Sequence, residues 1–139
     1  MKIGIIGTLG KWSSEQLADE IQRLTGHRFL VGMDEIVISG ANGRVTARGV
    51  DLLELDALVV KKISEQYSHN LMDRLEILRS LERRGLRIFS SPDAIATAAN
   101  RLSCTLALME AGIPMPRTVI TESLEYAAFA VSTFKRVVA

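Results

Sequence analysis

The sequence predicts an α/β protein in which helices cover a parallel β-sheet. Three observations carry this prediction. Short apolar runs of about four residues alternate with longer amphipathic segments, the runs are apolar enough for strands buried on both faces, and glycines mark several junctions between the two. Such alternation is typical of βαβ units and therefore of parallel pairing.

The first strand and helix can be placed from residues 3 to 26. Residues 3–6 are an apolar run that ends in glycine. The helix after it is expected to begin at Ser13, with Gln16 completing a capping box, and to end at Gly26. Its predicted apolar stripe consists of Leu17, Ile21 and Leu24.

The middle of the chain predicts two further strands, a hairpin and a second helix. Residues 29–31 and 56–60 have the apolar character of buried strands. Between them, Asn42-Gly43 separates two short apolar arms, which predicts a β-hairpin that decorates the parallel sheet. A helix over residues 69–84 would bury a leucine stripe, end at Gly85 and lead into a strand over residues 86–89; the stripe is Leu71, Leu75, Leu78 and Leu81.

After residue 91 the pattern changes to helices and an incomplete α+β segment. Ser91 is expected to cap a helix whose first residue is Pro92, and a second helix follows over residues 101–111. A strand over 118–121, a helix over 122–134 and a strand over 136–138 are then predicted. The last strand would leave Val137 and Val138 on an exposed edge, and such edges pair readily with another chain.

Composition excludes several classes of protein. The 139 residues are 47% hydrophobic and 24% charged, with a formal net charge of +1. This is the balance of a globular domain and not of a disordered chain, and it does not favour nucleic acid or an anionic membrane as a partner. A single cysteine, Cys104, and the lack of an apolar span of about 20 residues predict a cytoplasmic protein.

Two groups of residues are candidates for ligand binding. Gly4, Gly7 and Gly10 surround the first strand–helix junction, where backbone N–H groups can bind an anion, although glycines at such turns are often only backbone punctuation. Lys61 and Lys62 follow the carboxyl end of a buried strand, where α/β sheets bind ligands. Because neighbouring strand residues point to opposite faces, one of the two lysines at most would enter a given crevice, and both could instead be solvated.

The same loop contains Thr8 and Trp12, which complete the candidate substrate site. Trp12 could line the crevice or pack as a hydrophobic staple at the start of the helix. Neither His27 nor His69 has a neighbour at metal-ligand spacing, so no metal site is expected. No Ser-His-Asp or Cys-His spacing signature occurs, and no catalytic residue is assigned in this chain.

Three motifs follow one another after residue 89. They are Ser90-Ser91-Pro92-Asp93-Ala94-Ile95, Asn100-Arg101-Leu102-Ser103-Cys104-Thr105 and Ala111-Gly112-Ile113-Pro114-Met115-Pro116-Arg117-Thr118. In this order they resemble the ATP-grasp superfamily, and most closely its RimK-like glutamate ligase branch. Family members read roughly N-S-P-x-A-I, D-K-x-x-T-x-x-L and G-I-P-x-P-x-T. Arg101 thus stands where relatives carry a nucleotide-contacting lysine, and Asn100 stands in place of the usual Asp.

The resemblance implies a division of the chain into three parts. Residues 1–91 would be the Rossmann-like pre-ATP-grasp domain, residues 92–112 would be linking helices, and residues 113–139 would begin the first ATP lobe. Arg101 would be the ATP-binding residue in this chain. Substrate contacts would come from the first domain, at Lys61, Lys62, Gly7, Thr8, Gly10 and Trp12.

The resemblance also implies a reaction. ATP-grasp ligases use ATP and Mg²⁺ to activate a carboxylate as an acyl phosphate, which an amine then attacks. The second nucleotide-binding lysine, the glycine-rich loop and the magnesium ligands of the family would lie beyond Ala139, so this chain alone is expected to be inactive and to bind neither ATP nor Mg²⁺ tightly.

Its substrates would be small-molecule or peptide carboxylates and amines, and residues 113–139 would mediate a homo-oligomer or a swapped dimer. The alternative is a free-standing α/β module that binds a ligand or partner without catalysis.

Overall fold

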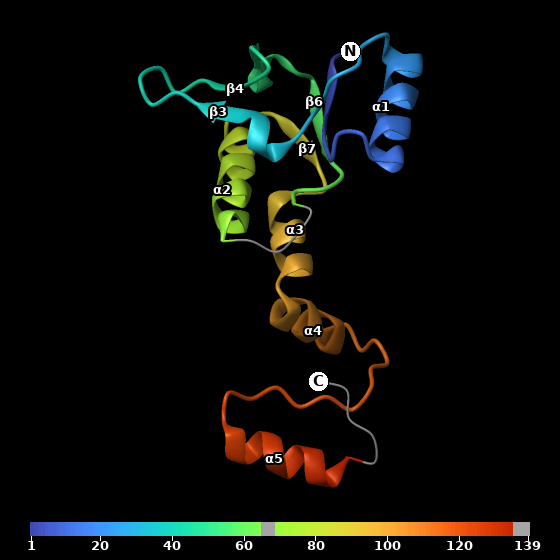
Figure 1. The fold of residues 1–139 in the computed structure, drawn as a ribbon, viewed down its shortest axis with the longest axis vertical. Coiled ribbons are helices and arrows are strands. Elements are labelled where there is room, and N and C mark those ends of the chain that lie inside the picture. Colours follow the sequence, from blue (N-terminus) through green and yellow to red (C-terminus); the bar gives the residue numbers. More distant parts are fainter. Residues whose placement is uncertain (65–68, 135–139) are drawn as a thin grey trace. The chain divides into compact units, whose positions relative to one another are not determined.

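A computed structural model describes residues 1–64 and 69–134 of the chain. The chain divides into two compact units, Met1–Asn100 and Arg101–Ala139 (Figure 1). The helix that follows residue 91 lies in the first unit. The functional division at residues 91 and 112 stays a prediction.

The first unit is built on a parallel sheet of four strands in the order β2-β1-β6-β7. The strands are β1 (Ile3–Ile6), β2 (Leu30–Val31), β6 (Ala57–Val60) and β7 (Arg87–Phe89). In register, Ile5 of β1 stands beside Leu30 on one side and Val59 on the other. The predicted parallel sheet is therefore confirmed, with the first strand at its centre.

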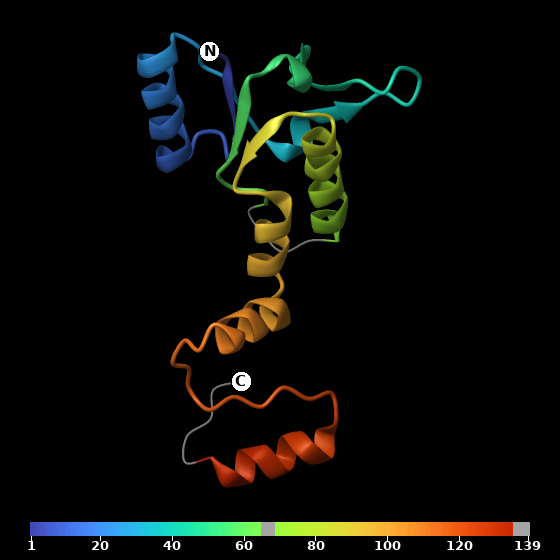
Figure 2. The same cartoon turned by 180° about the vertical axis from the view of Figure 1, so that it is seen from behind.

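Helices cover both faces of this sheet (Figures 1 and 2). They are α1 (Trp12–Thr25) and α2 (Asn70–Arg83). Ile5 packs in a cluster with Ala18 of α1, whereas its neighbour Ile6 packs in a larger cluster with Leu78 and Leu81 of α2. Because successive side chains of a strand point to opposite faces, a strand covered in this way must be apolar throughout.

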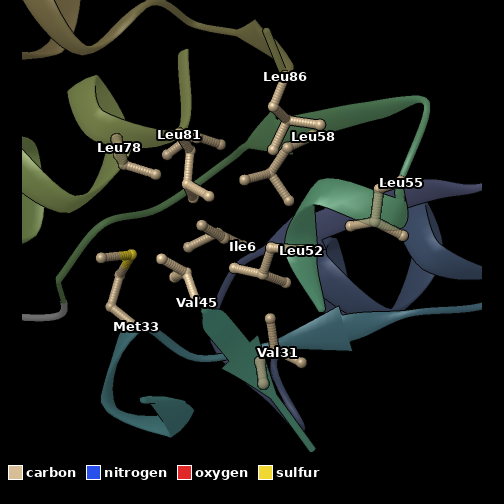
Figure 3. Close-up of a cluster of buried hydrophobic side chains, with 12 residues drawn as sticks. Ile6, Val31, Met33, Val45, Leu52, Leu55, Leu58, Leu78, Leu81 and Leu86 are labelled. Atoms are coloured by element: carbon tan, nitrogen blue, oxygen red, sulfur yellow. The ribbon is translucent and has the colours of Figure 1, made fainter. Parts of the chain in front are cut away.

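The larger cluster joins the parallel sheet to a second, antiparallel one (Figure 3). That sheet has the order β3-β4-β5, with strands β3 (Ile36–Ile38), β4 (Val45–Ala47) and β5 (Val50–Asp51). In the chain, a short 3₁₀ helix precedes this sheet and another follows it, η1 (Met33–Glu35) and η2 (Leu52–Glu54). Val45 of β4 and Leu52 of η2 are buried in the same cluster as Leu58 of β6.

The predicted hairpin is confirmed by the antiparallel pairing of Ile36 with Ala47 and of Ile38 with Val45. The third strand, β5, was not predicted. It is two residues long, and so short a segment carries no readable periodicity.

The start and the buried face of α1 differ from the prediction. The helix begins at Trp12, its N-cap is Lys11 without a side-chain hydrogen bond, and the expected capping box at Ser13 is therefore wrong. Leu24 is exposed, and the buried positions are Ser14, Ala18 and Ile21. These three positions are spaced four and three residues apart, so they share one face of the helix. The predicted end is confirmed, since Gly26 adopts the left-handed conformation with φ 75°.

The helices after the sheet largely follow the prediction. Ser91 caps α3 (Pro92–Ala99) by accepting a hydrogen bond from the N–H of Ala94 at 3.3 Å. In the second unit, the helices are α4 (Arg101–Glu110) and α5 (Leu124–Thr133). No helix in the described part of the chain is long and apolar enough to cross a membrane.

The predicted strand over residues 118–121 is wrong, because this segment is irregular. A strand needs a neighbour to receive its backbone hydrogen bonds, and no segment among the described residues pairs with this one. The predicted strand over residues 136–138, with Val137 and Val138, lies outside the described residues.

Candidate functional site

The candidate site lies at the carboxyl edge of the parallel sheet, beyond the ends of β1 and β6. From β1 the chain goes to β2 on one side, and from β6 it goes to β7 on the other, so the strand order reverses between β1 and β6. Ligands of open α/β sheets bind at such a reversal. The N–H groups of Lys61 and Lys62 both donate to the carbonyl of Ile6, at 2.9 and 3.2 Å, and thereby bring the two strand ends together.

The loop from Gly7 to Lys11 is folded tightly onto the first turn of α1. A Cβ atom at Gly7 would lie 2.9 Å from the hydroxyl oxygen of Ser14, so the close approach requires glycine. That hydroxyl, in a side chain only 1% exposed, accepts a hydrogen bond from the N–H of Thr8 at 3.2 Å. Gly10 turns the chain with φ 71°.

Glu15 holds the tip of the same loop. Its carboxylate accepts a hydrogen bond from the N–H of Gly10 at 2.7 Å and pairs with Arg28, which also pairs with Asp19 at 3.0 Å. The hydrogen bond from Gly10, followed by that from Arg28, lowers the pKa of Glu15. The loop therefore has two of its N–H donors, those of Thr8 and Gly10, occupied by side chains of α1.

Lys61 reaches across the strand reversal to α1. Its Nζ donates to the hydroxyl oxygen of Ser13 at 2.8 Å, which places an ammonium group at the N-terminus of the helix. Lys62 is exposed. Lys61 is thus joined to the first turn of α1, which follows the loop from Gly7 to Lys11 (the glycine loop). The divergence of the two lysines stays a prediction.

Trp12 is 78% exposed at the first position of α1. The staple interpretation is therefore wrong, because a staple requires the ring to pack against the helix. The indole lies beside Lys11 and Ser13 in sequence, on the loop that borders the candidate site. A role in binding remains a prediction.

Arg101 lies in the other unit, as the first residue of α4. Its carbonyl accepts a hydrogen bond from the Thr105 hydroxyl at 2.8 Å, and its side chain is exposed. The predicted substrate residues are therefore grouped in the first unit, and the predicted nucleotide residue stands apart from them in the chain.

The described residues contain no group of three His, Cys, Asp or Glu side chains that could hold a metal ion. Sequence reasoning missed Ser14, Glu15 and Arg28, which shape the loop. Their roles depend on contacts over six, five and thirteen residues, which no short motif encodes.

Comparison with curated proteins finds a tetrahydromethanopterin:α-L-glutamate ligase of Methanosarcina acetivorans. It is 40% identical to the chain over 83 residues, which is 60% of this chain and 26% of the ligase. No protein-family model matches the chain. The chain spans about a quarter of the length of this relative.

Comparison with solved structures finds the ATP-grasp ligase PsnB in two complexes. One is with a phosphomimetic variant of the minimal precursor, Mg and ADP, at a TM-score of 0.63 and 14% identity, covering 94% of this chain and 50% of the other. The second is with the minimal precursor, at the same TM-score and 16% identity, covering 94% and 49%. The predicted resemblance is confirmed: the chain has the fold of about half of an ATP-grasp ligase and is similar in sequence to part of a glutamate ligase.

Proposed function

We propose that the chain is the N-terminal part of an ATP-dependent carboxylate–amine ligase of the RimK-like type. The observation that carries this proposal is the 40% identity with a glutamate ligase over 83 residues. The fold likeness to an ATP-grasp ligase over 94% of the chain supports it independently of sequence. A cytoplasmic location, inferred from the single cysteine, belongs to the same proposal.

The proposed reaction has two steps. A substrate carboxylate attacks the γ-phosphorus of ATP, which forms an acyl phosphate and releases ADP. An amine then attacks the acyl carbon, forms the amide and releases phosphate. The name of the curated relative suggests that glutamate supplies the amine and that a pterin-linked carboxylate is the group that ATP activates.

Within this scheme, the first unit contributes a substrate crevice. Lys61, hydrogen-bonded to Ser13 at the helix N-terminus, supplies positive charge at the strand reversal. The glycine loop and Trp12 complete the crevice, and Lys62 is the alternative candidate for the charged position. Arg101 would contact the nucleotide, since a guanidinium suits phosphate oxygens as a planar fork.

ATP and Mg²⁺ would act in the longer protein. One of the two PsnB structures is a complex of that ligase with Mg and ADP. The proposal assigns their chemistry, phosphoryl activation of the carboxylate, to residues outside this chain. This chain alone is expected to show no ATP turnover.

The test compares the 139-residue chain with a longer gene product that contains it. The longer protein should release ADP over repeated turnovers only when carboxylate and amine are both present, and hydroxylamine should replace the amine and yield a hydroxamate. ATP turnover by the 139-residue chain would refute its predicted inactivity. A longer protein without ATP-dependent amide formation would refute the ligase proposal.

The crevice is tested by Lys61→Ala and Lys62→Ala in the longer protein. Loss of the ammonium group should raise KM for the acidic substrate about tenfold, the usual size for one charge-assisted hydrogen bond. Unchanged kinetics in both variants would remove the crevice.

A second candidate function is a free-standing α/β binding module. The observation that favours it is the place of the buried core: among the described residues, each buried hydrophobic residue precedes Arg101 and so belongs to the first unit. The first unit also contains the carboxyl edge of the parallel sheet, where the candidate site lies. It would therefore bind a ligand without the second unit. Ligand binding by a chain ended at residue 100, equal to that of the 139-residue chain, would favour this module.

A further inference from the structure

Arg48 adopts a backbone conformation that does not suit it. Arg48 and Gly49 are the two residues between β4 and β5, flanked by the pair Ala47 and Val50, and their φ angles are 49° and 79°. Positive φ at both central residues is the mark of a type I′ turn, whose first position normally holds Asn, Asp or Gly. A longer side chain is strained there, so its presence needs another reason.

Glu35 holds the Arg48 side chain and ties it to the parallel sheet. The Nε of Arg48 donates to Oε1 of Glu35 at 2.7 Å, and the other oxygen of Glu35 accepts the N–H of Gly32 at 2.8 Å. Gly32 directly follows the carboxyl end of β2. The turn of the antiparallel sheet is thus fastened to the carboxyl edge of the parallel sheet.

The ion pair between Arg48 and Glu35 uses Nε of the guanidinium and leaves Nη1 and Nη2 available to a ligand. Among the described residues, no acceptor takes a hydrogen bond from Nη1 or Nη2 of Arg48, and the side chain is 47% exposed. Two nitrogens in a planar fork match the two oxygens of a carboxylate or phosphate.

Strain is found at a second point of the same edge. Within the described chain, the other non-glycine residue with positive φ is Ser90, at 34°, and it directly follows β7. Both strained residues are therefore tied to carboxyl ends of the parallel strands. Strained backbone that persists at one edge of a sheet favours a binding role over a purely structural one.

We propose that Arg48 is a binding residue that holds an oxyanion of a ligand, a carboxylate or a phosphate, at the carboxyl edge of the parallel sheet. Glu35 is its positioning residue, since it holds Nε, while Nη1 and Nη2 donate to no acceptor among the described residues. The identity of the ligand rests on the proposed ligase function, whereas anion binding by Arg48 does not. The competing interpretation is that Arg48 only braces the turn through Glu35.

The test uses Arg48→Asn in the 139-residue chain. Asn suits the first position of a type I′ turn, so the variant removes the guanidinium and relieves the backbone strain. Titration calorimetry with glutarate and with inorganic phosphate, at constant ionic strength, measures binding. We expect about tenfold weaker binding in the variant, with an unchanged or higher melting temperature. Arg48→Gly, which also suits the turn, is a second test of the same kind.

Arg44→Gln is the matched control. Arg44 directly precedes β4 and pairs with Asp51 of β5 at 2.9 Å, so its loss changes the net charge equally and leaves the edge intact. It should bind both anions as the native chain does. Stronger binding of glutarate would identify a carboxylate ligand, and stronger binding of phosphate would identify a phosphate group.

Two results would overturn the proposal. Either Arg48→Asn and Arg48→Gly bind both anions with native affinity, or the native chain binds neither. The ligase assay on the longer protein is separate from this measurement. A longer protein that forms no amide, together with anion binding that depends on Arg48, would refute the ligase function and leave this inference in place.

Discussion

Gly4 occupies a point in β1 where no side chain has room. A Cβ atom there would lie 2.7 Å from Cδ1 of Leu55 and 3.1 Å from Cδ1 of Leu58. Both leucines are buried in the core, so they cannot move away without cost. In the sequence, Gly4 was grouped with Gly7 and Gly10 as part of one glycine-rich turn. The distances separate their roles: Gly4 permits packing, Gly7 permits contact with Ser14, and Gly10 permits a turn.

Gly4→Ala should lower the free energy of unfolding by about 1–3 kcal/mol, because it overpacks the core around Leu55 and Leu58. Chemical denaturation measures this change. Gly40→Ala is the matched control, since a Cβ there would meet no atom within 4 Å, and its effect should stay within about 0.5 kcal/mol. Equal effects of the two substitutions would contradict the packing role of Gly4.

At the scale of the element, α2 shows how an amphipathic helix closes one face of the sheet. Leu75, Leu78 and Leu81 of the predicted stripe are buried, whereas its first member, Leu71, is half-buried. Met72, on the same helix, is exposed. The spacing of three to four residues places the three leucines on one side, and burial of that side stabilises the helix more than its intrinsic propensity does.

Leu78→Ala should destabilise the chain by about 2–5 kcal/mol, through lost transfer free energy and the cavity that remains. Thermal and denaturant unfolding followed by circular dichroism measure the loss. Met72→Ala on the exposed side should change stability by no more than about 0.5 kcal/mol. A small loss for Leu78→Ala would mean that α2 is not part of the core.

At the scale of the whole molecule, the two units differ in how they are stabilised. The first contains both hydrophobic clusters. In the second, none of the residues from 101 to 134 is buried, and α5 exposes Leu124 at 89% and Phe129 at 67%. Exposed apolar side chains of this size favour association with another surface.

We therefore expect the 139-residue chain to self-associate through residues 113–139, as the sequence also predicts. Sedimentation velocity should show an average mass that rises with concentration. Replacing Leu124 and Phe129 together by Glu should abolish the rise, because charge opposes burial in an interface. Leu24→Glu, at an exposed apolar position of α1, is the control and should leave it unchanged. A native chain that stays monomeric at high concentration would contradict this expectation.

The sequence by itself determined the elements whose signals are local. The apolar run of β1, the leucine stripe of α2 and the Ser91-Pro92 start of α3 were all readable, because periodicity and caps act within a few residues. The strand expected over residues 118–121 failed for the converse reason. Its residues favour extended structure, but a strand exists only where a neighbour pairs with it.

Only the tertiary structure decided how the site is assembled. The sequence indicated Lys61 and the glycine loop as separate candidates, and the fold brings them together through Ser13. The pairing of Arg48 with Glu35 joins a turn to the last residue of η1, thirteen residues away, and the backbone strain that marks Arg48 has no signature in the sequence. Helix and strand formation depend on neighbours along the chain, whereas a binding site depends on neighbours in space.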